Sequence, residues 1–511
     1  MARNPTTKSQ VQAYQFVLRR IESALVRKDP AMLHEPMRTH LRAAAVGLII
    51  GVLGVAAFFV VGLFAPDDDL GDSNIVVGKQ SGAIYVVQQA EPRRLIPVRN
   101  LASARLLLAS PTFSSPAFNS GTGPSGGAEV KVVEDSSLAD LPRAPLTGIE
   151  GAPAYLPGPD RQVDPEWAVC DTAELDETAP DAETNPAITT TALVGVPRPG
   201  QQLGADRALL AEEAVTGTVY LLFDGKRARV NLADPAVRNA LRLADVQPRP
   251  VSTSLLNAIP ASDALVPPEI PGAGDPAPFP GLSGQDIGDV FQVNFVGGPE
   301  RYYLILAEGK HQVSRGVANL VRYDRSNDLE IPLVTPEDST RVPDAPRPSQ
   351  IDFAGYPEQV PEIVPVAESL VACLTWTAPD GEEPATAITI SDEIELDEGM
   401  RPVDVLPSVP GEVIADEVFL PPSKGALVRG VLPGQGTGGG AIFLVTDQGY
   451  RYGVPSLEVA NAIGLGDSTR PAPEAILDLL PIGPSLDPRA AFELYDPESA
   501  ARQLEAQLAG G

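Results

Sequence analysis

The order of apolar and polar positions divides the chain into a short head, one long apolar segment and a long body. Residues 43–65 contain no charged side chain. A helix of that length rises about 34 Å, enough to cross the hydrocarbon core of a bilayer. The segment begins late in the chain, and Leu63 and Pro66 make a poor cleavage site after Ala65. It therefore predicts a single uncleaved transmembrane helix.

Charged residues flank this segment asymmetrically. Residues 1–42 hold eight Lys or Arg against three Asp or Glu, and Arg42 borders the segment. Asp67, Asp68 and Asp69 follow it. Because Lys and Arg favour the cytoplasmic side, we expect a cytoplasmic head and a body outside the cytoplasm.

The head predicts a basic amphipathic helix, with Thr7 or Ser9 as candidate N-caps. Its apolar residues recur at spacings of three and four: Val11, Tyr14, Leu18, Ile21 and Leu25. Two interpretations stay open, a helix that lies on the inner leaflet and a docking helix for a cytosolic partner.

The body repeats one short pattern of elements. A strand, an Asp/Gly turn, a second strand and a short apolar helix occur clearly at 217–243 and 441–465, and more weakly at 83–108 and 301–322. Such repetition predicts an array in which neighbouring units cover one another's apolar faces.

The body has two cysteines, each beside one of the two tryptophans. Cys170 follows Trp167, and Cys373 precedes Trp376. In an oxidising compartment two such cysteines pair by default, and the alternative is two buried free thiols. A disulfide would bring the two intervals between repeats together and bury both indoles, which predicts one central domain built from both intervals.

The expected fold class is mainly β with short helices (α+β), because 53 Pro and 46 Gly disfavour long helices. The acidic stretches Asp171–Asn185 and Pro379–Gly399 predict solvated loops. The expected divisions are a head at 1–42, the transmembrane helix at 43–65, repeat 1 at 66–110, a first central segment at 111–205, repeat 2 at 206–262, repeat 3 at 286–345, a second central segment at 346–420, repeat 4 at 421–494 and a tail at 495–511.

Composition and motifs argue against most chemistries. A net charge of −29 argues against nucleic acid as a partner. His311 is the only histidine beyond the head, too few for a histidine-rich metal site or a well-supported Ser-His-Asp triad. No G-x-x-x-x-G-K-[ST] phosphate loop occurs, and Gly434–Gly439 fits G-x-G-x-x-G but precedes a predicted strand, where a dinucleotide site needs a helix. The residues thus predict no catalytic group, cofactor or metal.

Several segments in order resemble the EccB family, a core membrane component of the actinobacterial type VII (ESX) secretion system. They are Thr6–Glu22, the apolar segment, Asn100–Leu108, Gly151–Pro153, Trp167–Thr172, Cys373–Trp376, Tyr450–Pro455 and Leu457–Leu465. Together they span almost the full chain.

The resemblance implies a protein that crosses the inner (plasma) membrane once and carries four periplasmic repeats around a central domain. It implies a disulfide within the central domain, here Cys170–Cys373. It also implies assembly with EccC, EccD, EccE, the mycosin protease and further copies of itself.

The favoured function is a structural subunit that anchors and scaffolds the periplasmic portion of the export complex. EccB proteins have been described as ATPases, so an envelope nucleotide hydrolase is one alternative, although no phosphate loop supports it. A cell-wall-binding module is the other. In the apolar segment, the spacing of Gly47 and Gly51 predicts close packing against neighbouring helices.

Overall fold

The structure is a computed structural model of the full chain. It describes residues 7–28, 36–63, 70, 73–88, 92–110, 129–175, 186–196, 199–325, 330–347, 350–379, 383–407, 411–432 and 439–494. The chain divides into two compact units, Met1–Leu70 and Gly71–Gly511, and each is described by itself.

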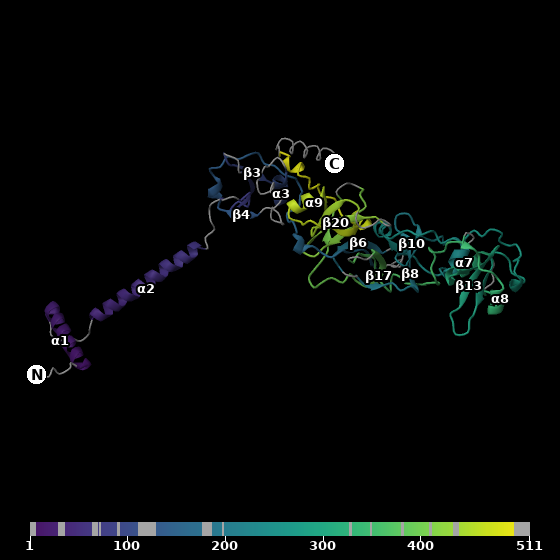
Figure 1. Cartoon of the computed structure of the whole chain (residues 1–511), viewed down its shortest axis with the longest axis horizontal. Coiled ribbons are helices and arrows are strands. Elements are labelled where there is room, and N and C mark those ends of the chain that lie inside the picture. The colour runs from purple at the N-terminus through teal and green to yellow at the C-terminus, as the bar shows by residue number, and fades with distance from the viewer. Residues whose placement is uncertain are drawn as a thin grey trace. The chain divides into compact units, whose positions relative to one another are not determined.

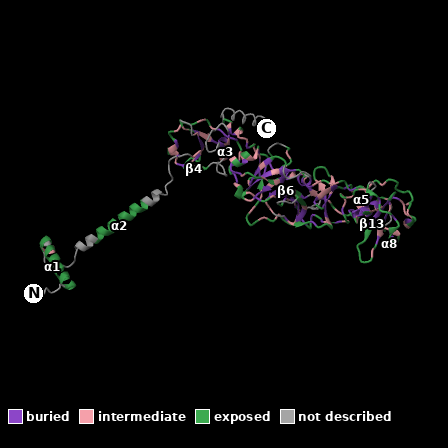
Figure 2. Cartoon of the chain, in the orientation of Figure 1, coloured by how far each residue is buried: buried purple, intermediate pink, exposed green. Residues whose placement is uncertain are grey.

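The first unit contains two helices, α1 (Lys8–Arg27) and α2 (Pro36–Leu63), both shown in Figure 1. Thr7 is the N-cap residue of α1, and its backbone N–H donates to the Gln10 side chain at 3.0 Å. All described side chains of α2, at positions 42–58, are exposed, as Figure 2 shows. Within the described residues, no helix is both long and apolar enough to cross a membrane.

The second unit contains four small sheets that are built alike. Each has three consecutive antiparallel strands, a helix, and then a segment that pairs in parallel with the first strand. We call them modules 1 to 4, at residues 75–138, 207–258, 290–340 and 425–477. A short helix closes each module, so the same order of elements occurs four times among the described residues.

The strands of the modules follow this common order. In module 1 they are β1 (Ile75–Gly78), β2 (Ile84–Gln88), β3 (Arg94–Val98) and β4 (Val130–Val133). In module 2 they are β8 (Arg207–Glu213), β9 (Val219–Phe223), β10 (Lys226–Arg229) and β11 (Arg249–Val251). In module 3 they are β12 (Val290–Val293), β13 (Arg301–Leu306) and β14 (Gly309–Val313), with a parallel bridge from Gln292 to Leu333 as the fourth member. In module 4 they are β20 (Gly425–Val431), β21 (Ile442–Thr446), β22 (Arg451–Val454) and β23 (Arg470–Pro473).

Each module contains two helices. The helix after the third strand is α3 (Leu101–Ala109), α5 (Pro235–Ala240), α7 (Arg315–Arg325) or α9 (Leu457–Ala462). The closing helix is η1 (Asp135–Leu138), α6 (Thr253–Ala258), α8 (Pro336–Thr340) or α10 (Glu474–Leu477). Polar caps start these helices where the sequence allows. Asn100, for example, accepts a hydrogen bond from the Ser103 N–H at 2.9 Å.

A larger sheet combines two distant segments of the chain. Its strand order is β18-β19-β6-β5-β16-β17-β7. The segment before module 2 supplies β5 (Glu166–Glu174), β6 (Ala187–Val194) and β7 (Gln201–Gln202). The segment after module 3 supplies β16 (Val371–Thr377), β17 (Ala385–Ser391), β18 (Val403–Asp404) and β19 (Glu417–Phe419). The remaining short elements are η2 (Pro159–Arg161), η3 (Pro280–Leu282), β15 (Glu362–Ile363) and η5 (Ala490–Phe492).

Apolar clusters join the modules to the central sheet and to each other. One cluster contains Trp167 and Trp376 of the central sheet with Leu255 of α6 and Ile476 of α10. Another combines module 1 with module 4, through the leucines of α3 and β20. A third places Leu320 of α7 with α5, so modules 2 and 3 also share a core.

Two expected loops are strands over some of their length. Asp171 to Glu174 continue β5, and residues 385–391 form β17. The prediction of solvated loops is wrong there because cross-strand pairing and burial of Ile388 and Ile390 outweigh the flanking acidic charge. Residues 176–185 of the first stretch lie outside the described residues.

Candidate functional site: the disulfide core of the central sheet

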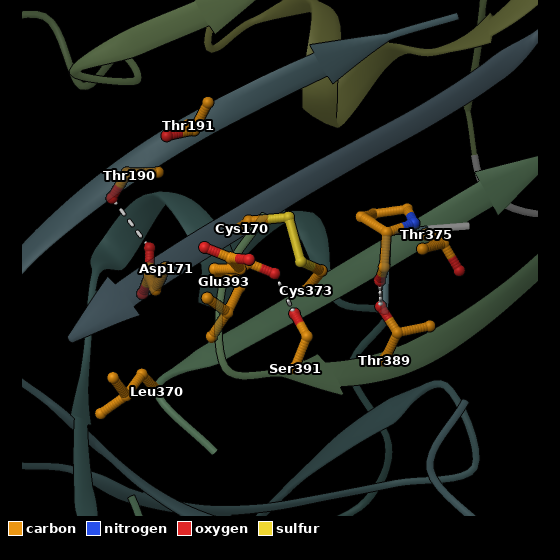
Figure 3. Close-up of a disulfide and its surroundings, with 12 residues drawn as sticks. Cys170, Asp171, Thr190, Thr191, Leu370, Cys373, Thr375, Thr389, Ser391 and Glu393 are labelled. Carbon is orange, nitrogen blue, oxygen red and sulfur yellow. Dashed lines mark hydrogen bonds between the residues drawn. A yellow bond between two sulfur atoms is a disulfide. The ribbon is translucent and has the colours of Figure 1, made fainter. Parts of the chain in front are cut away.

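The centre of the larger sheet is a covalently linked strand pair. Strands β5 and β16 are antiparallel, with Cys170 opposite Cys373 and Trp167 opposite Trp376. The two cysteines form a disulfide across a sequence separation of 203 residues (Figure 3), and both are fully buried. Because side chains alternate along a strand, the indoles lie on the face opposite the sulfurs and pack with modules 2 and 4.

A buried carboxylate lies next to this disulfide. Asp171 is 1% exposed and accepts hydrogen bonds from the Ser252 N–H at 2.6 Å, the Ser252 hydroxyl at 2.8 Å and the Thr190 hydroxyl at 2.8 Å. Figure 3 shows the bond from Thr190. Ser252 is also the N-cap of α6, where its hydroxyl accepts from the Leu255 N–H. Asp171 therefore fixes the start of the closing helix of module 2 to the central sheet.

A buried guanidinium interacts electrostatically with this carboxylate. Arg249, the first residue of β11, is 2% exposed and donates from Nη2 to the Leu370 carbonyl at 3.2 Å. Its Nε and Nη1 atoms have no partner among the described residues. Burial lowers the pKa of Arg249 to about 10, and the Asp171 carboxylate opposes that shift. Burial raises the pKa of Asp171, against the opposing effects of the Ser252 and Thr190 hydrogen bonds and the Arg249 charge.

The network extends to the second central segment. The Thr190 N–H donates to the Asp416 carboxylate at 2.8 Å, and the Asp416 N–H donates to the Thr190 carbonyl at 2.9 Å. The Ser254 hydroxyl of α6 donates to the Ile414 carbonyl at 3.2 Å. Hydrogen bonds thus connect β5, β6, module 2 and the residues just before β19 at one place.

Each module also has a cation–π contact between an aromatic ring and a basic side chain. Tyr85, Tyr220, Tyr303 and Phe443 each lie on the second strand of their module. The cations above them are Arg143 at 5.5 Å and Arg227, Lys310 and Arg451 at 5.4 Å each from the ring centroid. The last three lie on the third strand, whereas Arg143 comes from a segment that pairs with Leu95 of β3. Module 1 therefore reaches the same cation–π contact from the neighbouring segment.

The structure places the predicted head residues on one exposed helix. Val11, Tyr14, Leu18, Ile21 and Leu25 are all exposed on α1, and so are Phe16 and Val17, which the predicted stripe did not include. Arg42 is an exposed residue of α2. A Cβ atom at Gly47 or Gly51 would meet no described atom within 4 Å. Asp67, Asp68 and Asp69 lie outside the described residues.

The other candidate chemistry does not assemble into a site. His311 lies on β14 beside Phe353, with ring centroids 5.8 Å apart, and burial lowers its pKa. Among the described residues, no group of three or more His, Cys, Asp or Glu could hold a metal ion. Most of the Gly434–Gly439 motif lies outside the described residues. The arrangement is that of a scaffold whose polar groups fix elements to one another.

Sequence reasoning missed Asp171 and Arg249. Ser252, which binds Asp171, lies 81 residues away, so no local pattern connects the two. The available signal was an acid that directly follows the apolar run Trp167-Ala-Val-Cys170. Strand β5 contains three carboxylates, and Asp171 is the buried one, so it requires donors from elsewhere in the fold.

Comparisons with known proteins give one consistent relationship. The family model described as "Type VII secretion system ESX-1, transport TM domain B" (EccB) matches residues 3–497. The chain is 32% identical to the ESX-3 secretion system ATPase EccB3 of Mycolicibacterium smegmatis, over 96% of this chain and 91% of that protein. It is 31% identical to the ESX-5 secretion system ATPase EccB5 of Mycobacterium tuberculosis, over 96% and 94%.

Solved structures give the same relationship. A chain of an intact ESX-5 inner membrane complex aligns with a TM-score of 0.68 at 27% identity, over 97% of both chains. The EccB3 dimer from the ESX-3 core complex also aligns with a TM-score of 0.68, at 30% identity over 82% of this chain and all of that chain.

Proposed function

Because the chain belongs to the EccB family of type VII secretion proteins, we propose that it is a structural subunit that scaffolds the periplasmic portion of an ESX inner membrane complex. The observation that carries this proposal is the full-length similarity to a chain of an intact inner membrane complex. The fold supports it, since buried polar contacts join module 2 to the central sheet.

The test is co-purification from native membranes. The tagged full-length chain should recover further copies of itself together with EccC, EccD, EccE and the mycosin protease, identified by mass spectrometry. Recovery of the chain alone, under conditions that keep other membrane complexes intact, would contradict the proposal.

We propose a single membrane crossing by residues 43–65, with the head in the cytoplasm and the second unit in the periplasm. The uncharged length, the basic head with Arg42, and the following Asp67, Asp68 and Asp69 support this topology. Alkaline phosphatase that is fused after residue 70 should be active, and alkaline phosphatase that is fused after residue 28 should be inactive. The reverse result would show the opposite topology.

We propose that modules 1 to 4 are four copies of one repeat around the disulfide-linked central domain. Modules 2 to 4 lie within the boundaries expected from the sequence, whereas β4 and η1 of module 1 lie beyond the expected end of repeat 1 at residue 110. The modules' shared strand order and the cation–π contact in each support a common unit. Limited proteolysis should then cleave first between modules and leave each module intact, whereas early cleavage inside β-sheets would argue against such units.

We propose that α1 is a docking helix for a cytosolic component of the complex. Its exposed residues Tyr14, Leu18 and Leu25 support an apolar contact. The substitution Leu18→Glu should reduce recovery of cytosolic domains in the co-purification, while Gln12→Glu on the same helix should not. Unchanged recovery of cytosolic domains with Leu18→Glu would contradict the docking role and favour the inner-leaflet interpretation instead.

A second candidate function is nucleotide hydrolysis, because the curated relatives carry the name ATPase. The chain has no G-x-x-x-x-G-K-[ST] segment to hold phosphates. Purified full-length protein should show no ATP turnover above background, and turnover that a point substitution in the chain abolishes would establish the enzyme.

A further inference from the structure

The two faces of the central sheet are covered in different ways. The face with Trp167 and Trp376 packs against modules 2 and 4 in a large apolar cluster. The face with the disulfide carries a smaller cluster, whose buried members are Ala168, Cys170, Leu193, Val371, Cys373 and Phe419. The half-buried residues that pack against it are Val196, Ile394, Leu396 and Met400. Residues 393–402, which we call the lid, therefore cover much of the disulfide's side of the sheet.

The lid contains no helix or strand and is weakly attached. Between described residues, its hydrogen bonds are local. The Ser391 hydroxyl donates to the Glu393 carbonyl at 2.8 Å, and the Met400 N–H donates to the Asp397 carbonyl at 3.0 Å. Figure 3 shows the first of these bonds in the surroundings of the disulfide. Segments with few buried contacts open at a lower free energy than the sheet they cover, so the lid can open while the sheet stays folded.

An open hollow of about 650 Å³ lies along the lid, and Met400 and Pro402 line it together with residues 393–399. Four of the lining residues are exposed acids, Glu393, Glu395, Asp397 and Glu398. Their charge repels anions, including the thiolates that open disulfides. A small uncharged oxidant such as hydrogen peroxide meets no such repulsion when it approaches Met400.

Met400 is the only methionine of the sequence beyond residue 37. Both cysteines are joined in the disulfide, so the Met400 thioether is the sulfur of the second unit that peroxide oxidises readily. A peroxide transfers one oxygen atom to Sδ, its O–O bond breaks, and water leaves. The thioether loses two electrons to the peroxide and becomes a sulfoxide. An apolar side chain thus becomes a polar one, whose burial without a hydrogen-bond partner costs free energy.

We propose that Met400 is an oxidation site at which a peroxide loosens the lid and so exposes the Cys170–Cys373 disulfide to thiols. In the reduced form, Met400 packs against the cluster that contains both sulfurs, and the acidic residues of the lid keep thiolates away. In the oxidised form, the sulfoxide oxygen is stabilised by water, and the lid leaves the sheet.

The exposed disulfide then reacts by ordinary thiol exchange. A thiolate attacks one sulfur, and the other cysteine leaves as a thiolate that takes up a proton. A second thiol releases the first cysteine, so two thiols are oxidised to a disulfide and the protein gains two cysteine thiols. The oxidation state of Met400 thereby controls the covalent link between the two central segments. The inference concerns the central sheet and does not depend on the proposed function.

The experiment uses the full-length chain in detergent. Native protein is treated with hydrogen peroxide, and peptide mass spectrometry measures the fraction of Met400 sulfoxide. The protein is then incubated with dithiothreitol, and thiol alkylation follows the opening of the disulfide. The oxidised protein should open about tenfold faster than untreated protein. Met400→Leu is the matched control, because it keeps the apolar packing without an oxidisable sulfur. It should open slowly with and without peroxide.

Two further variants separate the lid from general instability. Met400→Gln places a permanent amide dipole at the same position and should open about tenfold faster without any peroxide. Ile388→Val removes one methylene from the opposite face of the same sheet, in the cluster that contains both indoles. It leaves the lid intact and should change the opening rate by less than about twofold.

The proposal fails if peroxide leaves Met400 unoxidised while it oxidises free methionine in the same solution. It also fails if the oxidised protein opens at the untreated rate, or if Met400→Leu responds to peroxide as the wild type does. An acceleration by Ile388→Val equal to that of oxidation would show that the disulfide opens through unfolding of the sheet instead. Co-purification tests the proposed function separately from all of these results.

Discussion

At the scale of single residues, Asp171 explains how the modules are held to the central sheet. Its carboxylate accepts three hydrogen bonds, and the buried Arg249 is close enough for each charge to favour the charged form of the other. A buried charge pair contributes little net stability over apolar side chains, but removal of one partner leaves the other uncompensated. The pair therefore specifies how module 2 attaches more than it strengthens the fold.

The substitution Asp171→Ala should be severely destabilising. It leaves Ser252 and Thr190 without their acceptor and Arg249 buried without its counter-charge, which costs about 3–5 kcal/mol in the free energy of unfolding. Chemical denaturation of the second unit measures this change. Asp392→Ala, at an exposed position near β17, is the control and should change stability by less than about 0.5 kcal/mol. An equal effect of both substitutions would contradict the role of Asp171.

The pH dependence of stability follows from the burial of Asp171. Burial raises the pKa of this carboxyl above its ordinary value, so the folded state binds a proton more tightly than the unfolded state does. The stability from that proton is complete below the unfolded pKa and is lost as pH rises through the folded pKa. Relative to Asp171→Asn, the wild type should therefore lose free energy of unfolding as pH increases above about 4. A pH-independent difference between the two proteins would contradict this sign.

At the scale of elements, the sequence predicted the middle of each module and missed its edges. The second strand, turn, third strand and helix have local signals, such as Asp224-Gly225 between β9 and β10. The first strand β8, Arg-Ala-Leu-Leu-Ala-Glu-Glu, consists mostly of helix-favouring residues and becomes a strand through pairing with β9 and β11. The fourth strands β11 and β23 contain proline and pair with residues far away in sequence, so no local pattern identifies them.

The disulfide is the covalent element between the two central segments. Its loss frees a loop of 203 residues in the unfolded chain, for which the chain-entropy relation gives about 5 kcal/mol as an upper value. The double substitution Cys170→Ser, Cys373→Ser should lower the melting temperature of the second unit by several degrees or more. Reductant should reproduce this loss in the wild type and have no effect on the double variant. A wild-type melting temperature that reductant does not change would contradict a stabilising role.

At the scale of the whole molecule, each module is held to its neighbours by a different type of contact. Module 1 joins module 4 through an apolar cluster and through Arg105, which donates to the Ile463 carbonyl at 2.8 Å. Module 2 joins the central sheet through Asp171 and Arg249, and module 3 joins module 2 through α7 and α5. The sequence predicts repeated modules and so suggests such an array. Which module packs against which depends on contacts between residues far apart in the sequence, and only the structure shows these.

The same reasoning applies to α2, whose small residues have nothing to contact within the described chain. A Cβ at Gly47 or Gly51 meets no described atom within 4 Å, so bulky substitutions there cannot disturb the described fold. If these glycines pack against helices of other subunits, Gly47→Leu with Gly51→Leu should lower partner recovery from native membranes about tenfold, which corresponds to about 1.4 kcal/mol. Ala56→Leu is the matched control, because nine positions from Gly47 place it on the opposite helix face. Equal recovery with the glycine and alanine variants would show that α2 faces lipid on both sides.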